Sequence, residues 1–161
     1  MKACSLRNRL VLPLLLYTCL LLIGTLWPLN FLANGAFLTK KIASVEWLPF
    51  TYRCPVCGFD FKDKILNLGM FMPFGFFLSL FLSGGKPNLR GILSAGEYGF
   101  LFSLTIEFAQ LFLPDRTTQA SDLVLNTLGG AGGAALAVLY AKCRNYFFPS
   151  EKPAQKWRPL L

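Results

Sequence analysis

Residues 63–69 read Asp-Lys-Ile-Leu-Asn-Leu-Gly, and they open an apolar run that continues to Leu82. The same pattern recurs later in the chain as Asp122-Leu-Val-Leu-Asn126-Thr-Leu-Gly129, again at the start of an apolar run. Each Asp lies four residues before its Asn, so each pair occupies one face of a helix. Carboxylates and carboxamides inside apolar segments are costly unless they are paired or functional. The two stretches therefore predict membrane helices that begin with polar residues of functional interest.

The composition agrees with a membrane location. The chain has 161 residues, of which 54% are hydrophobic and only 15% are charged, and its mean hydropathy is +0.49. A soluble domain of this length could not bury so much apolar surface. We expect an all-α integral membrane protein that forms one domain over residues 1–161.

Four apolar stretches, at residues 10–28, 65–82, 92–113 and 123–141, approach the ~20 residues that a helix needs to span a bilayer. They predict an antiparallel bundle of four transmembrane helices, with an outer loop at residues 29–63 and a basic tail at residues 142–161. In that loop, Trp47-Leu-Pro49-Phe50 is typical of an interfacial or re-entrant element. Because the Asp-x-x-x-Asn pattern occurs twice, the bundle is alternatively interpreted as two helical hairpins related as a parallel repeat.

The basic residues indicate the orientation rather than a nucleic-acid partner. The net charge is +8, and the bases flank the apolar runs and fill the tail. The positive-inside rule then favours a multi-pass protein of the inner membrane with both termini in the cytoplasm. Membrane lipids are the expected partners of the tail.

Several enzyme classes are excluded by what the sequence lacks. It contains no His, which removes imidazole bases and His metal ligands, and no Walker-type phosphate loop. No cofactor is expected. Cys54-Pro-Val-Cys57 predicts a disulfide or redox-labile pair, half of a zinc site shared between two chains, or unpaired thiols. No complete metal site within one chain is expected.

Antiparallel helices would bring one set of polar residues to the outer end of the bundle. Segment 92–113 runs outward, so that its last turns reach the level at which segments 65–82 and 123–141 begin. The expected cluster consists of Asp63, Asn67, Glu107, Gln110, Arg116, Asp122 and Asn126. Either Asp is alternatively a helix cap, whereas an intramembrane carboxylate such as Glu107 is a functional candidate by default.

Two further expectations concern this end of the bundle. Glu107, Arg116 and Asp122 are expected to form one coupled unit, because a carboxylate at that depth needs a positive or hydrogen-bonding partner. The aromatic side chains expected around the site are Phe71, Phe74, Phe108 and Phe112. The small residues that follow Asn126 predict that segment 123–141 is central, since they let another backbone approach closely.

The ordered set Asp63-x-x-x-Asn67-x-x-x-Phe71-x-Pro73-x-Gly75, Glu107-x-x-Gln110-x-Phe-x-Pro114-x-Arg116 and Asp122-x-x-x-Asn126-x-x-Gly129 resembles the VanZ-like family of bacterial membrane proteins. The resemblance implies a four-helix membrane domain in which these polar residues are functional. Some members of the family are linked to low-level resistance to the glycopeptide teicoplanin, without a settled biochemical activity.

Three functions remain open at this point. A non-enzymatic envelope protein could bind an amphiphile or a lipid-linked envelope component near the outer leaflet. An enzyme could act on a lipid-linked phosphate or sugar, with Glu107 or Asp122 as base and Arg116 stabilising negative charge. A structural or assembly subunit is the third. The lack of a nucleophile–base pair favours a non-enzymatic role, and we assign no catalytic residue.

Overall fold

The computed structural model describes residues 2–50 and 61–147. These residues form five helices: α1 (Lys2–Leu26), α2 (Gly35–Ala43), α3 (Phe61–Leu82), α4 (Leu89–Gln110) and α5 (Ala120–Phe147). In the described part of the chain, the only strand-like pairing is an isolated bridge between Glu46 and Gln119. The prediction of an all-α protein is therefore confirmed.

Three of the described helices are long and apolar enough to cross a membrane, namely Leu6–Leu26, Asp63–Leu82 and Ala120–Phe147. They indicate a membrane protein. The fourth expected span forms α4, which has 22 residues but is not among these three. It contains Glu97, Glu107 and several small polar residues. The expectation of four apolar spans is thus confirmed for three of them.

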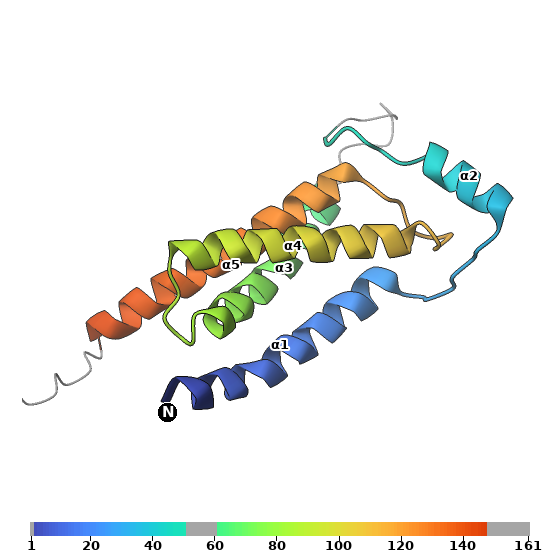
Figure 1. Cartoon of the computed structure of the whole chain (residues 1–161). Helices are drawn as coiled ribbons and strands as arrows, with labels where there is room; N and C mark the ends of the chain where they lie inside the picture. Colours follow the sequence, from blue (N-terminus) through green and yellow to red (C-terminus); the bar gives the residue numbers. More distant parts are fainter. Residues whose placement is uncertain (1, 51–60, 148–161) are drawn as a thin grey trace, which may run out of the picture.

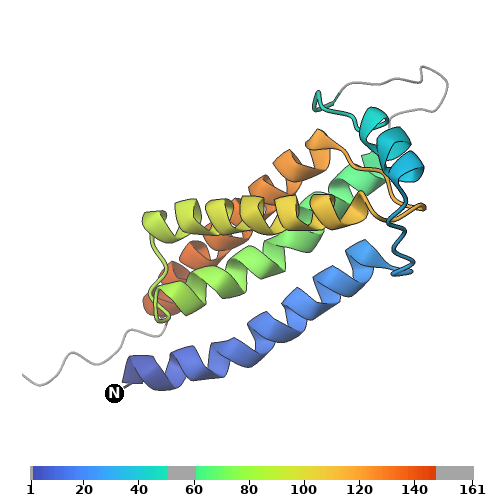
Figure 2. The ribbon, with the colours of Figure 1, turned by 45° about the vertical axis from the view of Figure 1, so that its right-hand side comes forward.

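The four long helices run back and forth along a common direction (Figure 1). Helices α3 and α5 begin at the end where α1 and α4 finish, and the short helix α2 lies at that same end (Figure 2). We call it the α2 end. The sequence pattern did not reveal α2, which begins after Asn34, whose side-chain oxygen accepts a hydrogen bond of 2.9 Å from the amide of Ala36.

Helix α5 packs closely on both α3 and α4 through its glycines. A Cβ atom on Gly133 would overlap the carbonyl group of Met72 in α3. On the other side of α5, a Cβ atom on Gly130 would lie 2.9 Å from the carbonyl oxygen of Ala95 in α4. Only glycine permits such a close approach of helix backbones, which is how small residues act in membrane bundles. These contacts place α5 at the centre of the fold.

Helix α1 is the peripheral member of the bundle. Leu21 is its buried anchor, and the Tyr17 hydroxyl donates a 2.8 Å hydrogen bond to the Met70 carbonyl of α3. By contrast, Leu12, Leu16 and Leu20 are more than half exposed. An apolar face of this kind is expected where lipid surrounds the helix.

Candidate functional site

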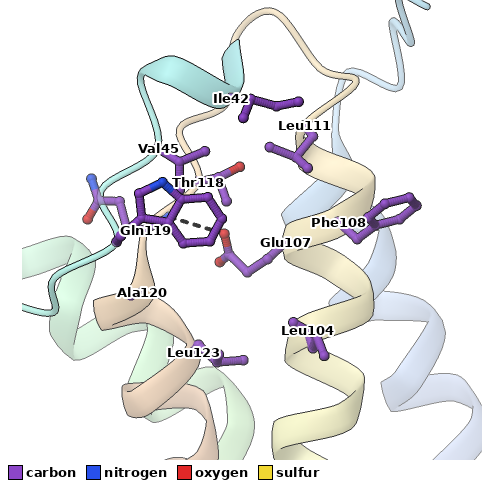
Figure 3. Close-up of a pocket in the computed structure, with 11 residues that line it drawn as sticks. Ile42, Val45, Leu104, Glu107, Phe108, Leu111, Thr118, Gln119, Ala120 and Leu123 are labelled. Atoms are coloured by element: carbon purple, nitrogen blue, oxygen red, sulfur yellow. Dashed lines mark hydrogen bonds between the residues drawn. The ribbon is translucent and has the colours of Figure 1, made fainter. Parts of the chain in front are cut away.

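Glu107 is the most buried carboxylate at the α2 end. It lies in the last turn of α4, is only 7% exposed, and accepts a hydrogen bond of 3.2 Å at Oε2 from the backbone amide of Gln119 (Figure 3). Gln119 immediately precedes α5. Within the described residues, Glu107 takes part in no ion pair. A charged carboxylate so placed would have less hydrogen bonding than it has in water, which is costly.

Asp122 is paired with Lys64, a residue that the sequence analysis did not include in the cluster. Lys64 Nζ lies 2.9 Å from Asp122 Oδ1, and the two side chains are 15% and 18% exposed. The same ammonium donates to Ser121 Oγ at 2.5 Å and to Gln119 Oε1. The pair ties the first turn of α3 to the first turn of α5. In the sequence, only the position of Lys64 beside Asp63 at the start of an apolar run could have indicated this role.

Arg116 does not join the unit expected with Glu107 and Asp122. Its Nε donates to the Trp27 carbonyl at 3.1 Å, and its Nη2 donates to the Gly24 carbonyl at 2.9 Å. Gln110 Nε2 donates to the neighbouring Thr25 carbonyl at 2.9 Å. The last carbonyls of a helix lack partners within the helix and carry partial negative charge. Arg116 and Gln110 therefore cap the C-terminus of α1.

The segment around α2 is fastened to the connection between α4 and α5. Lys41 Nζ donates to the carbonyls of Leu113, at 2.8 Å, and of Arg116. Glu46 accepts a 2.9 Å hydrogen bond at its carbonyl from the amide of Ala120. Burial lowers the pKa of Lys41, and the nearby carboxylate of Asp115 partly opposes this. These contacts hold α2 and Val45 over the start of α5.

The remaining polar residues of the expected cluster are spread over different levels. Asn126 is buried between α4 and α5, where its Nδ2 donates to Ser103 Oγ at 2.8 Å. Asn67 is half-buried in α3, and Asp63 is exposed in the first turn of that helix. The seven residues thus contribute to the surroundings of Glu107 and Asp122, to the cap of α1, and to the interior of the bundle.

Two of the four aromatic residues expected around the site lie in the core instead. Phe71 and Phe74 are 1% and 7% exposed and pack against Phe102, with ring centroids 6.0 and 5.2 Å from it. Phe108 lies beside Glu107 in the wall of a cavity, and Phe112 contacts Phe108 edge to face. Phe71 and Phe74 occupy the face of α3 that is turned toward α4. The spacing of aromatic residues alone does not reveal which face of a helix meets which neighbour.

A cavity of about 360 Å³ adjoins Glu107. Its wall is almost entirely apolar, and it lies between the segment after α2, the last turns of α4 and the start of α5 (Figure 3). The lining side chains are Ile42, Val45, Trp47, Leu104, Glu107, Phe108, Leu111, Thr118, Gln119, Ala120 and Leu123. The arrangement is an apolar chamber with one acidic group in its wall.

The structure offers no test of the cysteine pair, because Cys54 and Cys57 lie outside the described residues. Among the residues that are described, no group of three or more His, Cys, Asp or Glu side chains could hold a metal ion.

Comparison with protein families relates the chain to a known family. No curated protein and no solved structure matches the chain. A family model described as VanZ/LLP1 matches residues 14–141, a region that contains Glu107, Arg116 and both Asp-x-x-x-Asn patterns. The match covers most of the chain. It includes α3 and α4 in full, α1 from residue 14 onward and α5 up to residue 141. The chain therefore belongs to the VanZ/LLP1 family.

Proposed function

We propose that this protein is a non-enzymatic membrane binding protein that takes the apolar part of an amphiphile or lipid-linked envelope component into the cavity beside Glu107. The observation that carries the proposal is the apolar cavity of about 360 Å³ with a buried carboxylate in its wall. This volume lies near the lower end of the ~300–1,000 Å³ range of small-molecule sites. It suits one acyl chain or one ring system better than a whole two-chain lipid.

The side chains at the edge of the cavity support entry from the membrane. Ile42, Trp47, Leu104 and Phe108 line it and are 51%, 70%, 46% and 62% exposed. A soluble protein rarely leaves so many large apolar side chains together at a surface. In a bilayer they would contact lipid, so an amphiphile could enter sideways with its polar end near Glu107.

We further propose that α4 is the fourth transmembrane helix and that both termini are cytoplasmic, in the inner membrane. The buried residues of α4 include its polar side chains Ser103, Glu107 and Gln110. A helix of lower hydropathy can cross a bilayer when its polar groups face protein rather than lipid. With the bases at the chain ends inside, the α2 end and its cavity would lie at the outer leaflet.

In this interpretation, any effect on teicoplanin sensitivity would arise from binding of a lipid-linked envelope component at the cavity. Expression of the protein in a sensitive host, followed by measurement of growth against teicoplanin, tests that link. A Glu107→Gln variant should lose whatever protection the unaltered protein gives. Equal protection by both proteins would separate resistance from the cavity.

The binding function is tested directly by photolabelling. The purified full chain is incubated with a single-chain amphiphile that carries a diazirine near the end of its chain, and adducts are mapped by mass spectrometry. We expect adducts on Leu104, Phe108 and Leu123, and we expect Ala120→Trp to remove most of them by filling the cavity. Ala135→Trp is the matched control, because Ala135 is exposed on the same helix and away from the cavity.

A different distribution of adducts would contradict the proposal. Adducts spread evenly over exposed lipid-facing residues such as Leu136 and Leu139, with no effect of Ala120→Trp, would mean that the cavity binds nothing.

A further inference from the structure

We infer that the ligand's polar end is a positively charged hydrogen-bond donor, an ammonium group, and not a phosphate or a carboxylate. The inference rests on the proposed binding function and names the class of ligand. It follows from the unused acceptor positions of Glu107 beside the cavity, from the lack of any Lys or Arg among the described lining residues, and from the aromatic rings in the wall.

Glu107 keeps unused hydrogen-bond acceptor positions beside the cavity. A carboxylate offers two oxygens with about four acceptor positions, and the described contacts of Glu107 use one of them, for the amide of Gln119. Thr118 also lines the cavity, and its buried hydroxyl has no hydrogen-bond partner among the described residues. Figure 3 labels both Thr118 and Glu107 among the side chains of the wall. A donor in the cavity would serve the unused acceptor positions of Glu107, and the Thr118 hydroxyl can also accept a hydrogen bond.

Three described cations at the α2 end, namely Lys64, Arg116 and Lys41, are engaged with other acceptors. Lys64 is bound to Asp122, Ser121 and Gln119. Arg116 caps the carbonyls of α1, and Lys41 donates to carbonyls in the connection before α5. None of these three cations lines the cavity. An anionic headgroup there would disfavour the ionised form of Glu107, whereas an ammonium would stabilise it. The same arrangement weighs against a phosphate substrate held by Arg116.

Aromatic side chains in the wall add to the preference for a cation. Trp47 and Phe108 both line the cavity together with Glu107. A cation over the face of an indole or phenyl ring is attracted by the ring's quadrupole, most strongly for Trp. A carboxylate and aromatic rings around one small chamber thus form a setting in which an ammonium is favoured over a neutral or negative group.

The test compares amphiphiles that differ only in their headgroup. The full chain in maltoside detergent is photolabelled with the diazirine amphiphile in the presence of dodecylammonium, dodecanol or dodecyl phosphate as competitor. We expect dodecylammonium to displace the probe at a concentration about tenfold or more below that of dodecyl phosphate, the size of one charge-assisted hydrogen bond. The net charge of +8 attracts anions to the protein, so it works against this outcome.

Variants connect the preference to the named groups. Glu107→Gln should remove most of the preference for dodecylammonium while dodecanol still competes. Thr118→Val, which keeps the shape of the side chain, should weaken dodecylammonium several-fold and provides a second route if Glu107→Gln fails to fold. Glu97→Gln is the matched control on the same helix, because Glu97 is exposed and does not line this cavity.

The possible results separate the inference from the function beneath it. Equal or stronger competition by dodecyl phosphate would overturn the inference and leave amphiphile binding standing. A preference that survives Glu107→Gln and Thr118→Val unchanged would also overturn it. If none of the three competitors displaces the probe, the proposed function itself fails.

Discussion

Replacement of Gly133 by alanine is the sharpest test of how the bundle is held together. A Cβ atom at this position would overlap the carbonyl group of Met72, which belongs to the backbone of α3 and cannot rotate away. Helices α3 and α5 must then separate, which is overpacking and costs about 1–3 kcal/mol. Opposing this, alanine is favoured over glycine inside a helix by roughly 0.5–1 kcal/mol.

A control substitution at Gly132 cancels the gain in helix propensity. A Cβ atom on Gly132 would meet only the end of the Met72 side chain, at 3.9 Å, which is an ordinary contact. Gly132→Ala shares the gain in helix propensity without the clash, so the difference between the two variants isolates the clash. We expect Gly133→Ala to be less stable than Gly132→Ala by about 1–3 kcal/mol.

The measurement is reversible unfolding of the purified protein in mixed detergent with increasing dodecyl sulfate, followed by circular dichroism. Gly69→Ala is a second control, since nothing lies within 4 Å of a Cβ atom there. Equal stability of all three variants would refute the close contact of α3 with α5, and with it the position of α5 at the centre of the fold.

Three further predictions concern the α2 end and the membrane topology. Alanine substitutions of Lys64 and Asp122, alone and together, should show a coupling of about 1 kcal/mol or more in the same unfolding assay, and additive losses would mean that the ion pair contributes nothing. Arg116→Lys should destabilise the protein by about 1–2 kcal/mol, because one ammonium cannot reproduce the two hydrogen bonds from the guanidinium to the end of α1. Unchanged stability would mean that Arg116 does not cap α1. A compartment-sensitive reporter fused after Leu161 should report the cytoplasm, whereas an external signal would reverse the proposed topology.

The sequence sufficed to predict the helices because the hydrophobic effect acts on long segments. Residues 10–28, 65–82, 92–113 and 123–141 each fall largely within one observed helix. The prediction for 92–113 overran the end of α4 at Gln110, because Leu111 and Leu113 continue the apolar run after the helix has ended. Hydropathy records where apolar residues occur, and it does not record where a helix cap forms.

The candidate site was predicted less completely, and the reason lies in geometry between segments. Glu107 stood out because a carboxylate in an apolar run is unusual. The partner chosen for the acidic residues was Arg116, but Lys64 reaches Asp122 while Arg116 turns to the last carbonyls of α1. Which of several cations meets a given carboxylate depends on how the helices are rotated, and sequence spacing does not fix that rotation. The orientation of Phe71 was missed for the same reason.

Helix α2 was missed because it is short and lies in a loop rich in aromatic residues. Its start was readable from Asn34-Gly35, since Asn is a preferred N-cap. Its importance was not readable, because it depends on contacts between distant segments. Lys41 attaches α2 to the connection before α5, and Val45 lines the cavity. The cavity is therefore a property of the tertiary structure alone.

The most direct test of the account is an experimental structure of the protein embedded in lipid from its own membrane. The account predicts elongated density inside the cavity, enclosed by Leu104, Phe108 and Leu123, with its polar end within hydrogen-bond distance of Glu107. A cavity closed by its own side chains, or one that holds only water while lipid density stays outside, would contradict the claim that this chamber binds an amphiphile.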